Sequence, residues 1–82
     1  APRVLAIEEP TQGIDVSSKA EIHELLHKVA RDTGAVVLIA TSEFEELLGL
    51  ADDIYVMRSG SFSRHIPGAQ ATYHNILEHA LP

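Results

Sequence analysis

Apolar and polar residues follow one another along the chain in blocks that predict the element order β-α-β-α-β-β-α. Strands are expected at residues 3–7 and 35–40, and their short apolar runs, Val4 to Ile7 and Ala35 to Ala40, are typical of parallel strands that are covered on both faces. Between these runs, apolar residues recur at helical spacing, at Ile22, Leu25, Leu26, Val29 and Ala30. The pattern therefore predicts an α/β fold in which a helix packs one apolar stripe on the sheet and connects two parallel strands.

The boundaries of the elements are marked by turn and capping residues. Ser17 or Ser18 is expected to cap the first helix, because Ser18 begins a capping-box sequence, and Gly34 is expected to end it. The remaining pattern predicts a short helix at residues 43–50, strands at 53–58 and 61–66, and a terminal helix at 72–81. We expect one mostly parallel sheet in the order 1-2-3-4, with the fourth strand antiparallel at an edge.

Two adjacent acids, Glu8 and Glu9, end the first apolar run and are followed by Pro10. Nucleotide-hydrolysing α/β domains use acids at the ends of buried strands to present carboxylates to magnesium and to an attacking water. Because a residue before proline is biased towards extended backbone, Glu9 is expected to project from the end of the strand. Taken alone, the two acids are explained equally well as a polar loop with no catalytic role.

The residues beyond the acids extend the pattern in a specific order. Residues 11–16 read Thr-Gln-Gly-Ile-Asp-Val, the second apolar run ends in Thr-Ser-Glu at 41–43, and residues 49–57 read Gly-Leu-Ala-Asp-Asp-Ile-Tyr-Val-Met. Over nearly the whole chain this order closely resembles the C-terminal part of an ABC transporter ATP-binding domain, most closely the monosaccharide importers of the ribose and galactose type. The resemblance implies that residues 1–82 are a single domain cut from a P-loop NTPase core.

The resemblance also implies roles for the two acids. Residues 4–8 resemble the Walker B strand, whose terminal acid supports the magnesium ion of the nucleotide, usually through water. That acid is normally aspartate in the family, whereas this chain has Glu8. Glu9 matches the catalytic acid that polarises the attacking water.

Two further groups of residues match functional loops of the family. Gln12, Gly13 and Asp15 match the D-loop, which contacts a second ATPase domain across a dimer. Ser42 stands where most of the superfamily has a histidine that senses the γ-phosphate, and it resembles the C-terminal half of sugar importers with two fused ATPase halves. Together with Glu8, this serine implies a degenerate site that binds nucleotide and hydrolyses it slowly, because magnesium tolerates misplaced ligands poorly.

The phosphate-binding parts of the family do not occur in the 82 residues. The Gly-rich loop ending in Lys-Ser or Lys-Thr and the Leu-Ser-Gly-Gly signature lie upstream of Walker B, and the five glycines here are scattered. The chain also starts at Ala1 without an initiator methionine. We therefore expect a fragment that neither binds nor hydrolyses ATP, with Mg and ATP as cofactors of the parent protein only.

Charge and composition limit the partners. A formal net charge of −6 with six dispersed Lys and Arg residues argues against nucleic-acid binding. The longest apolar run is far shorter than the roughly 20 residues of a membrane span, and the absence of cysteine fits the cytoplasm. The resemblance implies a cytoplasmic subunit, peripheral on the inner face of the cell membrane, whose partners are a second ATPase domain and the membrane permease.

Two interpretations compete with the ATPase fragment. Residues 23–27 read His-Glu-Leu-Leu-His and match the zinc metalloprotease motif. At 100° per residue His23 and His27 lie away from the apolar stripe, and no third ligand is identifiable by spacing, so this interpretation is disfavoured. A catalytically silent α/β domain that uses the same strand ends for protein contacts remains open.

Overall fold

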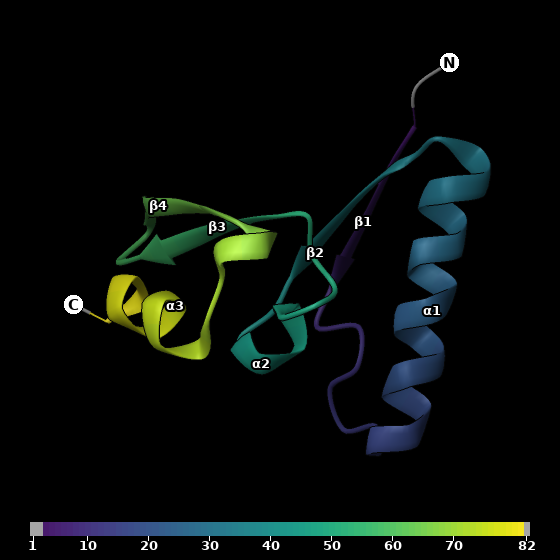
Figure 1. The fold of residues 1–82 in the computed structure, drawn as a ribbon, viewed down its shortest axis with the longest axis horizontal. Coiled ribbons are helices and arrows are strands. Elements are labelled where there is room, and N and C mark those ends of the chain that lie inside the picture. The colour runs from purple at the N-terminus through teal and green to yellow at the C-terminus, as the bar shows by residue number, and fades with distance from the viewer. Residues whose placement is uncertain (1–2, 82) are drawn as a thin grey trace. The chain divides into compact units, whose positions relative to one another are not determined.

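The computed structural model describes residues 3–81, and its elements follow the predicted order (Figure 1). The chain divides into two compact units, Ala1–Ser42 and Glu43–Pro82. That residues 1–82 form a single domain stays a prediction. The elements are β1 (Val4–Glu8), α1 (Val16–Thr33), β2 (Val36–Ala40), α2 (Phe44–Leu47), β3 (Asp53–Arg58), β4 (Ser61–Pro67), the 3-10 turn η1 (Gly68–Gln70) and α3 (Tyr73–Ala80).

The first unit is a β-α-β arrangement. Strands β1 and β2 are parallel, with a register that runs from Val4 opposite Val36 to Glu8 opposite Ala40. Helix α1 connects them and contacts β2 (Figure 1). The predicted parallel pair and its crossover helix are therefore confirmed.

The two ends of α1 differ in how well the sequence predicted them. The N-cap is Asp15, whose carboxylate accepts a hydrogen bond of 2.9 Å from the Ser18 N–H, so the expected caps Ser17 and Ser18 are wrong. Asp15 takes this place because its oxygen also accepts a hydrogen bond from the Ser17 hydroxyl, and the helix begins two or three residues earlier than expected. Gly34 ends the helix as predicted, with φ of 71° and its N–H donating to the Ala30 carbonyl.

The strands of the first unit are more exposed than their apolar sequences predict. Val4, Val36 and Leu38 each expose more than half of their surface, and among residues 3–42 the one buried apolar side chain is Leu26 of α1. Leu25, expected on the packed stripe, is exposed. Within the described residues 3–42, α1 is the one helix available to cover these strands, so the prediction that both faces are covered is wrong for this unit.

The second unit is an antiparallel hairpin with a helix packed on it. β3 and β4 pair from Asp53 opposite Pro67 to Arg58 opposite Ser61, with a bulge between Val56 and Met57. Its core consists of buried side chains from both strands and α3, namely Ile54, Val56, Ile66 and Ile76. Phe44 and Leu47 of α2 are among the partly buried residues that pack against this core. Alternation along β3 sends Ile54 and Val56 into this core and leaves Tyr55 and Met57 exposed.

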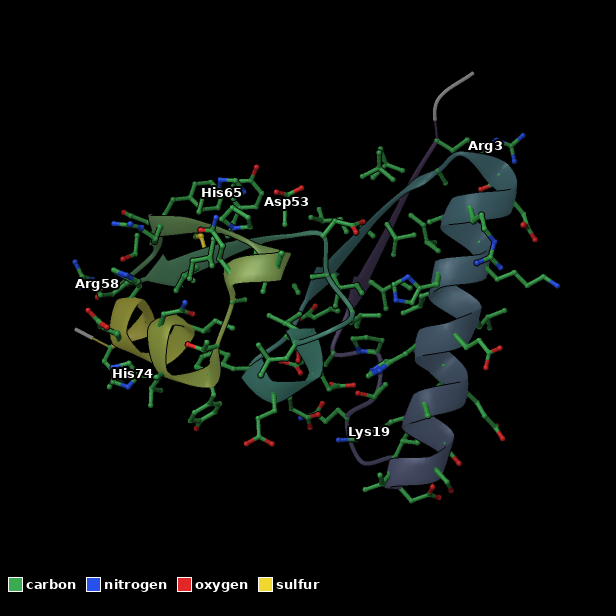
Figure 2. The ribbon with its side chains drawn as sticks, in the orientation of Figure 1. Arg3, Lys19, Asp53, Arg58, His65 and His74 are labelled. Atoms are coloured by element: carbon green, nitrogen blue, oxygen red, sulfur yellow. The ribbon has the colours of Figure 1, made fainter. Side chains whose placement is uncertain are left out.

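The exposed face of the hairpin carries a small aromatic cluster. The Tyr55 ring stacks on His65 with centroids 4.7 Å apart and meets Phe62 edge to face at 5.9 Å. His65 Nε2 lies 2.9 Å from a carboxylate oxygen of Asp53, and Figure 2 shows these two side chains next to each other. Asp53, the first residue of β3, therefore has a partner on β4.

The described strands form two two-stranded sheets, β1-β2 within the first unit and β3-β4 within the second. The parallel pairing of the first two strands and the antiparallel pairing of the fourth are confirmed. The single mostly parallel sheet in the order 1-2-3-4, with bonds between residues 36–40 and 53–58, is not confirmed. Within the second unit, β3 pairs with β4 and buries its inward side chains against α3. Within residues 3–81, no helix has both the length and the apolar composition needed to cross a bilayer.

Candidate nucleotide site at the ends of β1 and β2

The carboxyl ends of β1 and β2 lie side by side because the two strands are parallel and in register. Glu8 is opposite Ala40, and the N–H of the next residue, Glu9, donates to the Ala40 carbonyl at 2.7 Å. The residues that follow each strand are thereby brought together: Glu9 after β1, and Thr41 and Ser42 after β2. Ligand sites of α/β sheets form at this edge, outside the carboxyl ends of the strands.

Both carboxylate oxygens of Glu9 are held by the segment after β2. Oε2 accepts a hydrogen bond of 3.0 Å from the Thr41 hydroxyl, and Oε1 accepts one of 2.9 Å from the Ser42 N–H. The Glu9 side chain is half-buried, as is Thr41. Two of the residues predicted from the sequence, Glu9 and Ser42, are thus in direct contact although 33 positions apart.

The backbone at Glu9 differs from the extended conformation that we expected. β1 ends at Glu8, and Glu9 has φ of 47°, in the left-handed region that glutamate rarely adopts. The two hydrogen bonds to its carboxylate offset this strain, which typically costs on the order of 1–3 kcal/mol. Strained residues of this kind are often found at functional sites, although Ser59, in the turn between β3 and β4, also has a positive φ, of 51°.

The predicted D-loop residues follow Glu9 in a tight turn. The Gln12 N–H donates to the Glu9 carbonyl at 3.3 Å, and the Ile14 N–H donates to the Thr11 carbonyl at 3.1 Å. Gly13 has φ of 78°, which glycine adopts without steric cost. Gln12 and Gly13 are exposed, whereas Thr11 is fully buried. The tip of the turn is therefore exposed to solvent, and the residue before it, Thr11, is a buried threonine that the sequence analysis did not single out.

Asp15 has a structural role that its D-loop assignment did not anticipate. It is exposed and caps α1. Hydrogen bonds from the Ser18 N–H and then from the Ser17 hydroxyl hold the pKa of the Asp15 carboxyl below its usual value, because they favour the charged form. A contact of Asp15 with a second ATPase domain stays a prediction.

Glu8 is exposed at the end of β1 and has the chemistry of a magnesium ligand. Mg²⁺ prefers oxygen ligands and is commonly bound by one or two carboxylates together with waters and substrate phosphates. Residues 3–81 contain no group of three side chains that could hold a metal ion by themselves. Glu8 therefore fits part of a magnesium site, and the same finding leaves the disfavoured zinc motif at His23 and His27 without a third ligand.

A shallow hollow of about 160 Å³ in the second unit contains none of the predicted site residues. It lies between β4 and the terminal segment, and its polar lining includes Arg64, His65, Gln70, Asn75 and His79. Asn75 is already bonded within the unit, to the N-cap Thr72 and to the Gln70 carbonyl. The hollow therefore lies apart from the residues that the sequence singled out.

The geometry defines a class of protein: an α/β domain in which an acid at the end of one parallel strand is held by the polar loop after its neighbour. No family model matches the chain. It is 48% identical over 79 residues to the arabinose import ATP-binding protein AraG of Ralstonia nicotianae, covering 96% of this chain and 15% of that protein. It is 46% identical over 76 residues to the ribose import ATP-binding protein RbsA 2 of Streptomyces avermitilis, covering 93% and 15%.

A third relative, the ribose import ATP-binding protein RbsA of Shigella dysenteriae, is 40% identical over 76 residues. The chain spans about 15% of the length of each of these three relatives. The resemblance to ATP-binding subunits of ABC sugar importers that the sequence motifs predicted is confirmed. The chain belongs to the family of sugar-import ATP-binding proteins and matches one segment of them.

Proposed function

We propose that this chain is part of the ATP-binding subunit of an ABC-type sugar importer, and that the ends of β1 and β2 carry the hydrolytic side of its nucleotide site. The transport function is supported by two relatives, which are a ribose import and an arabinose import ATP-binding protein. The observation that carries the site is the bidentate contact of the Glu9 carboxylate with Thr41 and Ser42. A loop acid with no role would not need two fixed donors and a left-handed backbone.

Glu9 polarises the attacking water in this proposal. A carboxylate has about four lone-pair positions, so Glu9 can accept a hydrogen bond from water while it keeps its contacts with Thr41 and Ser42. Its carboxylate orients the water for in-line attack and accepts its proton. Glu8 would hold Mg²⁺. Bound Mg-ATP would supply the phosphoryl group that the water attacks, with ADP as the leaving group, and the cation that neutralises the developing charge.

Two departures from the family pattern make this a slow site. Glu8 is one methylene longer than the usual aspartate and would place its carboxylate differently towards Mg²⁺, and the Ser42 side chain lacks an imidazole for the γ-phosphate. Ser42 faces Glu9 through its backbone N–H, a contact that every residue except proline can make. Serine in place of histidine at position 42 therefore alters the contact with the γ-phosphate and keeps the backbone hydrogen bond to Glu9.

The remaining roles concern partners and location. The exposed turn at Gln12 and Gly13, with Asp15 after it, contacts a second ATPase domain, and the whole subunit docks on a membrane permease. It acts on the cytoplasmic side of the membrane without inserting into it and binds no nucleic acid. The isolated 82-residue chain binds no ATP, because a phosphate-cradling loop supplies most of the groups that hold the anion.

The test is the substitution Glu9→Gln in the full-length protein that contains this segment. Removing a general base is expected to lower ATP hydrolysis by roughly 10²–10⁴-fold while ATP binding, measured by calorimetry, is retained. Glu24→Gln, the same change at an exposed position of α1, is the matched control and should hydrolyse ATP at the parent rate. Unchanged hydrolysis in Glu9→Gln would refute the assignment and favour the catalytically silent interaction domain.

A further inference from the structure

Glu9, Thr41 and Ser42 are connected by two hydrogen bonds, and Thr41 is the one of these three residues to which the sequence motifs assigned no role. Its hydroxyl donates to Glu9 Oε2 at 3.0 Å from a half-buried position. We propose that Thr41 is a positioning residue that fixes the orientation of the Glu9 carboxylate for the attacking water. This inference rests on the proposed function of Glu9 and adds to it the group that aims its side chain.

The geometry gives Thr41 and Ser42 different parts in this hold. The Ser42 donor is a backbone N–H, so its position is set by the path of the chain after β2. The Thr41 donor is a side-chain hydroxyl, so it depends on the residue type at this position. Each donor binds a different oxygen, and two such contacts together fix the rotation of the carboxylate plane, which a single contact leaves free.

Threonine suits this role for physical reasons. Its β-branched side chain is stiff at χ1, so the hydroxyl points in one direction with little loss of entropy. A hydrogen bond to an ionised acceptor is roughly twice as strong as one between neutral groups, which makes the contact an effective anchor.

Thr41→Val and Thr41→Ser in the full-length protein test the inference. Valine keeps the branched shape without the hydroxyl, and serine keeps the hydroxyl without the methyl. We expect Thr41→Val to lower kcat for ATP hydrolysis about tenfold with KM for ATP unchanged, the loss expected when one hydrogen bond to a charged group is removed. Thr41→Ser should restore kcat to within about twofold of the parent, since it retains the donor.

A control variant and a structural readout separate positioning from a loss of stability. Thr33→Val is the same substitution at the end of α1, where the Thr33 hydroxyl donates to the Val29 carbonyl. This variant should keep the parent kcat. In crystals of the nucleotide-free protein, the Glu9 carboxylate should leave the Ser42 N–H in Thr41→Val and stay on it in Thr41→Ser.

The outcomes distinguish this inference from the proposed function. If Glu9→Gln lowers hydrolysis but Thr41→Val keeps the parent kcat, the positioning role is wrong and the role of Glu9 stands. A failure of serine to rescue, or a carboxylate that stays in place in Thr41→Val, overturns the positioning role as well. If Glu9→Gln is fully active, the proposed function fails, and the crystal structures still decide whether Thr41 orients the side chain.

Discussion

Ile76 of α3 is the most buried apolar side chain of the described chain and holds the second unit together. It exposes 1% of its surface and belongs to the core with Ile54, Val56 and Ile66. Replacing a buried isoleucine by alanine removes its transfer free energy and leaves a cavity, together about 2–5 kcal/mol. The smaller change to valine costs roughly 0.5–1.5 kcal/mol. Ile76→Ala is therefore expected to release α3 from the hairpin, and Ile76→Val only to weaken its packing.

Urea denaturation followed by circular dichroism at 222 nm measures the free energy of unfolding, and hydrogen exchange at the Val56 amide reports the hairpin locally. Val16→Ala is the matched control: it removes methyl groups from a helix at a position that is 84% exposed, and it should change stability by less than about 0.5 kcal/mol. An Ile76→Ala variant whose free energy of unfolding falls by less than about 1 kcal/mol would refute the core described for the second unit.

Two further predictions concern the ends of α1. Because hydrogen bonds lower the pKa of Asp15 in the folded state from 3.8, its charged cap stabilises the fold above pH 4 and this contribution is lost as pH falls through the lowered pKa. Thermal melts between pH 2 and 7 should show a shallower acid limb in Asp15→Asn, and an unchanged limb would contradict the cap. At the other end, Gly34→Ala forces a side chain into the left-handed conformation and should cost roughly 1–2 kcal/mol in urea denaturation. Gly34→Asn should cost less, and equal losses would argue against backbone strain as the cause.

The residues of the candidate site could be predicted where short sequence patterns mark them. The acids after an apolar run, the turn at Gly13 and the resemblance of the 41–43 segment to a family loop pointed to Glu9 and Ser42, which the structure brings into contact. The left-handed backbone of Glu9 was not predictable, because the preference of a residue before proline favours extended structure and only the contacts from the neighbouring strand offset it. Thr41 was missed because a single threonine after a strand carries no signal until its partner is known.

The order and type of the elements were determined by the sequence alone, because apolar periodicity and residues such as Gly34 act over one or two turns of chain. The tertiary structure decided what covers the strands: the inward side chains of β3 and β4 pack against α3. It also decided the hold on Glu9, whose two donors lie 32 and 33 positions away along the chain. These outcomes depend on which groups meet in space, which residue spacing along a chain does not contain.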